Sequence, residues 1–201
     1  MTPQAEDAAR LQKLLGDMNS ERAPRAATQS AVIDVILERV RCHRVSMWRF
    51  DGAGADLTLL CFVSKTADGV FDTSDRRLRR HEFIDYFNGL VGNGTYLSVD
   101  AMNDPALQPM RESYLIANNV ASMLDAAFVL NNRTYGMVCC EEPQRREWKA
   151  SDAMALRAIV NKIALLMWSA PDSVLLKSPS LPLRVIVDEL EAPRSPTDRR
   201  L

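Results

Sequence analysis

The stretch Ala121–Glu142, ASMLDAAFVLNNRTYGMVCCEE, decides how the chain folds. Its two halves, Ala121–Leu130 and Thr134–Glu142, are rich in apolar residues that suit β-strands. Between them lies Asn131-Asn132, and asparagine tolerates the positive φ angles that a two-residue hairpin turn requires. Pro143 has no amide hydrogen to donate to a neighbouring strand, so the second strand should end there. The stretch therefore predicts a central antiparallel hairpin.

An amphipathic helix is expected directly after this hairpin. Ser151 is a good N-cap residue, and Asp152 suits the positive end of a helix dipole. Apolar residues then recur at helical spacing, at Leu156, Ile159, Val160, Ile163 and Met167. We expect this helix to pack against the hairpin and to form the nucleus of the fold with it.

The N-terminal part of the chain predicts two helices and a second hairpin. Pro3–Met18 and roughly Ser30–Arg41 each carry apolar side chains on one side, with a linker at Asn19–Ala27. Arg44–Asp51 and Leu57–Ser64 are typical of two strands joined by a glycine-containing turn. Two amphipathic helices flanking a sheet-forming region would cover one face of the sheet.

The first of these strands is expected to present two different faces. Side chains alternate along a strand, which places Trp48 and Phe50 on one face and Met47 and Arg49 on the other. The polar segment Thr66–Ser74, which follows the second strand, is predicted to be a loop.

A basic run, Arg76–His81, allows two interpretations. It is either a solvated loop at the start of a helix or a clamp that binds anions through its guanidinium groups. The run lacks interleaved aromatic residues, which argues against a nucleic-acid groove.

The segment after the basic run predicts short elements. Glu82–Leu90 carries Phe83, Tyr86, Phe87 and Leu90 at the spacing of an amphipathic helix. We then expect a short strand at Tyr96–Val99, a polar loop at Asp100–Pro109 and a short helix at Glu112–Ala117.

Several of these patches, in this order, resemble a GAF domain. They begin with Val45-Ser-Met-Trp-Arg-Phe-Asp and Phe83-Ile-Asp-Tyr-Phe, and continue with Ala121-Ser-Met-Leu-Asp-Ala. Asn132-Arg-Thr-Tyr-Gly-Met-Val-Cys-Cys-Glu and Arg146-Glu-Trp-Lys-Ala-Ser-Asp follow. The chain is most similar to GAF modules of bacterial sensor kinases and diguanylate cyclases, although Ala127 stands where that pattern usually has proline. The resemblance covers roughly residues 28–168.

The resemblance implies an α+β, GAF/PAS-like fold. Its central antiparallel sheet would have about five or six strands, with the N- and C-terminal helices on one face. Short helices and loops would cover a pocket on the other face. The expected organisation is an N-terminal helix and linker at 1–27, a GAF domain at 28–170 and a partly disordered extension at 171–201. Within this extension, Leu183–Val187 suits an edge strand or a docking segment.

By resemblance, the segment Glu82–Ala117 forms a lid over the ligand. The expected ligand-binding residues are mostly aromatic or apolar: Trp48, Phe62, Phe83, Tyr86, Phe87, Tyr96, Tyr114, Met123, Asp125 and Cys140. Asp125 is an acid in an apolar strand, so it is either a structural acid paired with Arg49 or a backbone amide, or a group that recognises ligand. Glu141 and Glu142 lie near a strand end and are expected to be exposed to solvent.

The resemblance also suggests cofactors to test. Bilin-binding relatives attach their chromophore through a Cys-His pair in the helix beside the pocket. Here the only such pair, Cys42-His43, precedes the first strand, and Glu112–Ala117 has no cysteine, so no covalent bilin is expected. Free methionine sulfoxide reductases of this fold use cysteines in the middle loops. Residues 64–138 contain none, so that activity is not expected either.

Composition narrows the functional classes further. Apolar residues make up 47% of the 201 residues, as in globular domains, and the net charge of -1 gives no general attraction to nucleic acid. No apolar run approaches the roughly 20 residues of a membrane helix, and the N-terminus lacks the pattern of a signal peptide. The expectation is a cytoplasmic protein without a membrane or nucleic-acid partner. Its cysteines, Cys42, Cys61, Cys139 and Cys140, are expected to be reduced and buried.

The sequence leaves three functional classes open. The first is a non-catalytic sensory module that binds an unknown small molecule, dimerises through its terminal helices and acts on a signalling output protein. The second is an interaction or scaffolding module whose pocket is filled by its own side chains. The third is a redox enzyme that uses Cys61 or Cys140.

Overall fold

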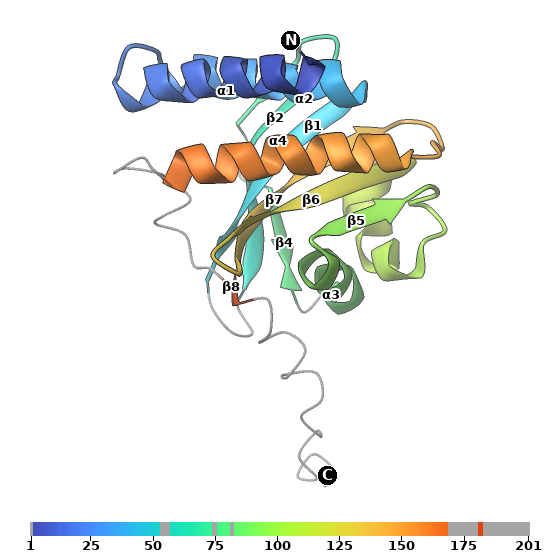
Figure 1. Ribbon diagram of the computed structural model, residues 1–201. Coiled ribbons are helices and arrows are strands. Elements are labelled where there is room, and N and C mark those ends of the chain that lie inside the picture. Colours follow the sequence, from blue (N-terminus) through green and yellow to red (C-terminus); the bar gives the residue numbers. More distant parts are fainter. Residues whose placement is uncertain (1, 53–56, 74–75, 81–82, 169–180, 183–201) are drawn as a thin grey trace, which may run out of the picture.

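A computed structural model describes residues 2–52, 57–73, 76–80, 83–168 and 181–182 (Figure 1). The main path of its antiparallel sheet has the strand order β3-β2-β1-β7-β6-β5, while β4 (Arg77–Arg79) also pairs with β2 and β8 (Leu181–Pro182) with β7. The bounds along the main path are β1 Arg44–Asp51, β2 Thr58–Thr66, β3 Phe71–Asp72, β5 Thr95–Ser98, β6 Ser122–Leu130 and β7 Arg133–Glu142. The expected α+β class is confirmed, and the six strands of the main path fall within the expected five or six.

The central hairpin forms as predicted. Strands β6 and β7 are joined at Asn131 and Asn132, whose φ angles are 49° and 61°. Positive φ at both turn residues defines a type I′ turn, whose twist matches that of the flanking strands. Strand β7 ends at Glu142, immediately before Pro143, as a residue without an amide hydrogen requires.

Gly136 allows β7 to lie close against β1. A Cβ atom at this position would lie 2.1 Å from the carbonyl oxygen of Trp48 and 2.8 Å from the Cα of Arg49. Only glycine fits there without moving the neighbouring backbone. The close approach holds β1 in the middle of the sheet, between β2 and β7.

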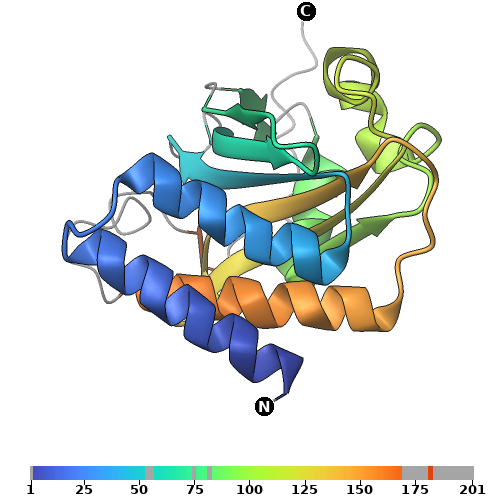
Figure 2. The ribbon, with the colours of Figure 1, turned by 90° about the horizontal axis from the view of Figure 1, so that it is seen from above.

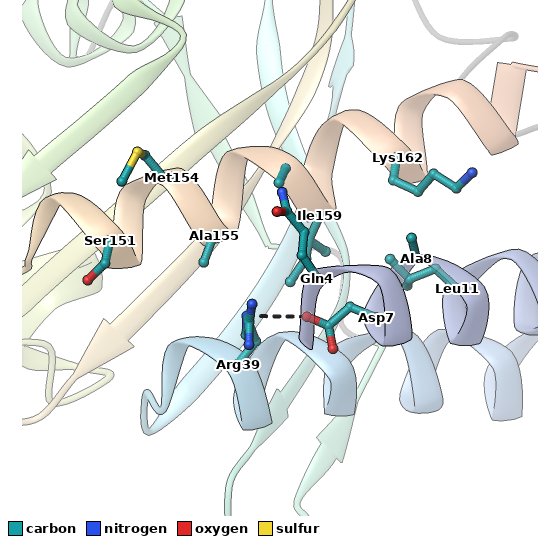
Figure 3. A pocket seen from close by; sticks show the side chains of 11 residues that line it. Gln4, Asp7, Ala8, Leu11, Arg39, Ser151, Met154, Ala155, Ile159 and Lys162 are labelled. Carbon is teal, nitrogen blue, oxygen red and sulfur yellow. Dashed lines mark ion pairs between the residues drawn. The ribbon is translucent and has the colours of Figure 1, made fainter. Parts of the chain in front are cut away.

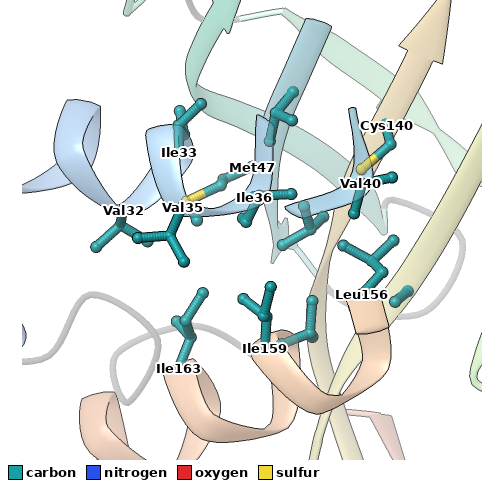
Figure 4. Close-up of a cluster of buried hydrophobic side chains, with 14 of the residues drawn as sticks. Val32, Ile33, Val35, Ile36, Val40, Met47, Cys140, Leu156, Ile159 and Ile163 are labelled. Atoms are coloured by element: carbon teal, nitrogen blue, oxygen red, sulfur yellow. The ribbon is translucent and has the colours of Figure 1, made fainter. Parts of the chain in front are cut away.

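Three helices lie on one side of the sheet, α1 Pro3–Asn19, α2 Arg25–Val40 and α4 Ala150–Trp168. Helices α2 and α4 pack against the strands, and α1 packs on these two helices (Figures 1 and 2). Apolar side chains fill the space between them and the sheet (Figure 4), among them Ile36, Val40, Met47, Phe128, Leu156 and Val160. This side of the sheet is called the helix face below.

Two helix starts differ from the sequence prediction. Helix α2 begins at Arg25, directly after the N-cap Pro24, and the predicted start near Ser30 was wrong. Proline fits ahead of the first turn because no intrahelical partner exists there for an amide hydrogen. Helix α4 begins at Ala150, so Ser151 lies within it, and the side chain of Asp152 accepts the Lys149 amide at 3.1 Å.

The opposite face, called the lid face below, is covered by shorter elements. Helix α3 spans Ile84–Asn93, a 3-10 helix (η3) spans Pro105–Met110, and a π-helix (η4) spans Arg111–Ile116. Part of the basic run, predicted to be a loop, instead forms β4, Arg77–Arg79, and the neighbouring predicted loop contains β3. Leu78 is buried while Arg77 and Arg79 are exposed, so this run alternates as a strand does.

Some predictions fall outside the described residues, namely those for His81 and for most of 171–201, including Leu183–Val187. Within 171–201, β8 Leu181–Pro182 pairs with Arg133 and Thr134. Among the described helices, none is both long and apolar enough to cross a membrane.

A candidate ligand site on the lid face

A row of polar residues crosses the lid face. Directly paired positions on five strands carry Ser64, Ser46, Cys139, Asp125 and Tyr96. Paired residues on neighbouring strands project to the same face of a sheet, so their side chains adjoin. Except for the half-buried Tyr96, these residues are buried. This row, called the polar row below, places hydrogen-bonding groups across an otherwise apolar surface.

Asp125 occupies the centre of the site and is fully buried. The Tyr86 hydroxyl on α3 donates a hydrogen bond to its Oδ2 at 2.7 Å, whereas Oδ1 has no well-oriented donor among the described residues. Burial raises the pKa of Asp125 to about 7, although hydrogen bonding from the facing Cys139 and from Tyr86 acts in the opposite direction. The suggested pairing with Arg49 was wrong, because among the described residues Arg49 pairs with Asp51 at 3.8 Å and Asp125 accepts from Tyr86.

A second buried acid, Glu141, lies at the neighbouring lid-face position of β7. Its side chain is 1% exposed, so the expectation that it faces solvent was wrong. The Tyr114 hydroxyl, from η4, donates to Oε1 at 2.6 Å, and Nε of Arg44 forms an ion pair with Oε2. Glu142 is half-buried and pairs with Arg146 at 2.8 Å. Both acids are held by partners within the protein.

The two lid helices therefore bind the sheet in the same way. Tyr86 from α3 and Tyr114 from η4 each donate a phenolic hydrogen to a buried carboxyl group on β6 or β7. Burial raises the pKa of both hydroxyls well above the usual value, which keeps them protonated as donors. Breaking either hydrogen bond without a replacement would leave one oxygen of a buried acid without its donor.

Aromatic rings fill the space around these hydrogen bonds. The ring centroids of Tyr86 and Tyr96 are 4.9 Å apart, and those of Trp48 and Tyr114 are 5.9 Å apart. The ring centroid of Phe87 lies 6.1 Å from that of Phe50 and 6.2 Å from that of Phe83. Tyr96 also donates to Asp104 at 2.9 Å, which connects β5 to the loop before η3.

Most of the predicted binding residues do lie together on the lid face. Its buried cluster, with the half-buried Tyr96 packed against it, contains Trp48, Phe83, Tyr86, Phe87, Tyr96, Tyr114 and Met123, and Asp125 lies among them. The placement of Cys140 at the pocket was wrong, because its side chain lies on the helix face beside Val40 and Leu156 (Figure 4). Its neighbour Cys139 faces the lid instead, as alternation along a strand requires.

Phe62 is also on the wrong face for the predicted site. Trp48 pairs with Cys61 and Met47 with Val63, so Phe62 is the extra residue of a β-bulge. Its half-buried side chain packs against the helix-face cluster. A bulge shifts the alternation along the strand, and simple counting along the sequence cannot detect it.

Sequence reasoning missed several polar residues of the site. Arg44 and Ser46 precede Trp48 by even spacings and therefore share its face, and Glu141 shares the face of Cys139 in the same way. That signal was present in the sequence. Asn118, which approaches the same region from a loop, carries no comparable pattern, whereas Arg76 belongs to the basic run already considered as an anion clamp.

The described residues offer no obvious reactive or metal centre. No group of three or more His, Cys, Asp or Glu side chains that could hold a metal occurs among them. All four cysteines are free and buried, and burial raises the pKa of Cys61 to about 11. A buried thiol in this state is a poor nucleophile near neutral pH.

Comparison with known families agrees with this architecture. The GAF domain family model matches residues 25–167. The chain belongs to the GAF domain family. The resemblance inferred from the sequence patches is thus confirmed. No curated protein matches the sequence.

Solved structures with this GAF fold include photoreceptors. A far-red cyanobacteriochrome photoreceptor is 15% identical with a TM-score of 0.61, over 80% of this chain and 96% of that one. The GAF domain of PixJ from Thermosynechococcus elongatus, in its blue-light-absorbing form, is 14% identical with a TM-score of 0.56, over 83% and 87%.

The chromophore-binding domain of bacteriophytochrome RpBphP3 from R. palustris is 11% identical with a TM-score of 0.58, over 84% of this chain. The match covers only 62% of the RpBphP3 domain's own length. At these identities, the comparisons establish a shared fold.

Proposed function

We propose that this GAF domain is a non-catalytic regulatory module that binds a small molecule on the lid face. The observation that carries the proposal is the pair of buried carboxyl groups, Asp125 and Glu141, each of which accepts a hydrogen bond from a tyrosine hydroxyl of the lid. Buried acids destabilise an apolar core unless they are hydrogen-bonded. Here the donors are tyrosine hydroxyls on short elements of the lid, and the donors of a ligand could take their place. A ligand with matching donors would replace Tyr86 or Tyr114.

The signalling step would be a population shift between lid arrangements. A ligand that binds one arrangement more tightly shifts the equilibrium by that difference in affinity. Strand β6 offers a path across the sheet, because Asp125 faces the lid while Leu124 and Ala126 face the helices. Leu156 of α4 belongs to the same helix-face cluster. A shift of β6 would thus move α4, which would act on an output protein.

A second candidate is an interaction module whose lid face is permanently filled by its own side chains. The ring contacts of Tyr86, Phe87 and Tyr114 favour this alternative, because they already pack the space that a ligand would need. The two candidates differ in a simple observable. A self-filled domain would gain no thermal stability from any metabolite.

The photoreceptor relatives raise the question of a chromophore. Among the described lid residues, 83–117, there is no cysteine that could form a thioether link, and Cys61 and Cys139 are buried in the sheet cluster. The residues present therefore do not fit covalent attachment at the lid. We propose that any ligand binds non-covalently, and no step of the mechanism depends on a chromophore.

The third candidate, a redox enzyme, has less support. Cys61 and Cys140 are buried, and burial raises both thiol pKa values. A variant with all four cysteines replaced by alanine or serine should keep its ligand response. Loss of that response with the fold intact would favour the redox candidate.

We also propose that a second copy of the chain docks on the outer surface of α1 and α4. A groove of about 450 Å³ lies there, lined by residues such as Gln4, Ala8, Ala155 and Lys162 (Figure 3). Met154, which also lines this groove, is 65% exposed. Sedimentation velocity should show a dimer that Met154→Lys dissociates. Ile116→Lys, on the exposed lid surface, is the matched control and should stay dimeric.

The direct test of ligand binding is native mass spectrometry of protein purified from its host. We expect an added mass that disappears on denaturation and is reduced in Asp125→Ala. A metabolite library screened by thermal unfolding then identifies the compound. If the wild-type protein carries no added mass and no metabolite raises its Tm, the binding proposal fails and the self-filled interaction module replaces it.

A further inference from the structure

Two arginines converge on one side chain at the rim of the lid. Arg44, at the start of β1, and Arg76, just before β4, both donate to Oδ1 of Asn118, at 3.4 and 3.1 Å. Asn118 lies two residues after the end of η4 and is half-buried. A single amide oxygen, which carries no net charge, thus accepts hydrogen bonds from two cations.

Both guanidinium groups retain unused donors. Nη2 of Arg44 and Nε of Arg76 are buried and have no hydrogen-bond partner among the described residues. The Arg44 side chain is only 12% exposed, so little water reaches it. Five donors in a planar fork suit a carboxylate or phosphate far better than one amide oxygen.

Among the described residues, the remaining contacts of Arg76 leave its charge weakly compensated. Its Nη2 donates to Ser64 at 2.7 Å and lies 3.8 Å from the Cys61 sulfur. Its acidic neighbour Asp72 is 3.7 Å away and about half exposed, so solvent screens this pair. By contrast, Arg44 already has a buried carboxylate partner in Glu141.

We propose that Arg44 and Arg76 form a subsite for an oxyanion, the carboxylate or phosphate of a small organic ligand, whose oxygens replace Oδ1 of Asn118. The inference rests on the proposed function and names the chemical class of its ligand. Bidentate hydrogen bonds from guanidinium groups to such an anion are short and strong. The rest of the ligand would extend from the rim toward the polar row.

The position of Asn118 connects this subsite to the lid. Nδ2 of Asn118 donates to the backbone carbonyl of Tyr114 at 2.8 Å, and the Tyr114 hydroxyl donates to Glu141. An anion that displaces the Asn118 side chain therefore disturbs η4 at the residue that holds one of the two buried acids. Anion binding at the arginines and rearrangement of the lid are therefore coupled through Asn118.

The test is thermal unfolding of the whole chain in sodium phosphate and in sodium succinate, against sodium chloride at matched ionic strength. In the wild-type protein, Tm should rise to a plateau with phosphate, succinate or both, which distinguishes the two anion types. Arg76→Gln should raise the midpoint, the anion concentration that gives half of the maximal Tm increase, by about tenfold or more, since a charged hydrogen bond is lost. Arg79→Gln, an exposed arginine of the same run, is the matched control and should keep the wild-type midpoint.

A second variant tests the proposed replacement of Asn118. Asn118→Asp places a carboxylate between the two guanidinium groups, so it should raise Tm in chloride and abolish the response to added anion. Absence of a saturable effect in the wild-type protein, or an equal effect in Arg76→Gln, overturns the subsite.

The outcome also separates this inference from the proposed function. If the ligand identified by mass spectrometry stabilises wild-type protein and Arg76→Gln equally, the lid-face function stands and the oxyanion subsite falls. If phosphate binds with the expected arginine dependence but no ligand is found, the subsite stands and the proposed function falls.

Discussion

The Tyr86 hydroxyl on α3 donates a hydrogen bond of 2.7 Å to the carboxyl group of Asp125 on β6. Both side chains are fully buried, so water cannot replace either partner. Across the same face, Tyr114 and Glu141 repeat the arrangement from η4 to β7. The lid is thus held by hydrogen bonds whose strength depends on the protonation state of the acids and on whether a ligand binds them.

The first prediction concerns the pH dependence of stability. The pKa of Asp125 is about 7 in the folded protein, against an ordinary value of 3.8, so the folded state retains a proton that the unfolded state has lost. The stabilisation is complete below pH 4 and is lost as pH rises toward 7, by up to about 1.4 kcal/mol per pH unit. Urea unfolding from pH 4.5 to 7.5 measures it.

Asp125→Asn provides the control for this dependence, because its side chain cannot titrate. The difference in unfolding free energy between wild type and variant should shift in favour of the variant as pH rises. A difference that stays constant across the range would contradict a raised pKa at Asp125.

The second prediction concerns the Tyr86–Asp125 hydrogen bond. Tyr86→Phe keeps the ring but leaves the acid unsatisfied, so unfolding free energy should fall by about 1–3 kcal/mol at pH 7. Adding Asp125→Asn should recover part of the loss, because a neutral amide is less costly to bury than a carboxylate. A double-mutant cycle measures the coupling. Strictly additive effects would mean that the bond contributes nothing.

The third prediction tests the close approach of β7 to β1. Gly136→Ala should lower stability by about 3 kcal/mol, because the new methyl group meets the Trp48 backbone. Gly16→Ala is the matched control. No atom lies within 4 Å of its new Cβ, and the change should stabilise α1 by about 0.5–1 kcal/mol. Equal effects of the two substitutions on Tm would refute the contact.

The fourth prediction concerns Arg146. Its guanidinium group stacks 4.1 Å from the Trp148 ring centroid and donates to the carbonyl oxygens of Val40 and Arg41 at 2.9 and 2.7 Å. Arg146→Lys keeps the charge but loses the planar fork, and should destabilise the protein by about 2 kcal/mol. Arg145→Lys changes an exposed neighbour and should lower the urea midpoint little. Comparable losses would show that the geometry of Arg146 is unimportant.

Local chemistry explains what the sequence could predict. Asn131 and Asn132 impose a turn that only a few residue types tolerate, and the alternation in Arg44–Asp51 assigns Trp48 and Met47 to opposite faces. Ordered motif patches identified the family and, with it, the placement of the helices. These features depend on residues that are close in the sequence, so they can be predicted from the sequence.

The errors arise where tertiary contacts decide the outcome. The bulge that moves Phe62 to the helix face exists only in the pairing of β1 with β2. Glu141 looks like a surface acid until Arg44, which pairs directly opposite it on β1, and Tyr114 enclose it. Cys140, by contrast, could have been placed correctly, because an adjacent cysteine on the same strand must point the other way.

The bonds of Arg146 have one more consequence. They fasten the last turn of α2, the end of β7 and, through Asp152 at 3.1 Å, the start of α4 at a single corner of the molecule. Because these contacts fix the start of α4, we expect any displacement of the helix to be smallest at its first turn and to increase toward its C-terminal end.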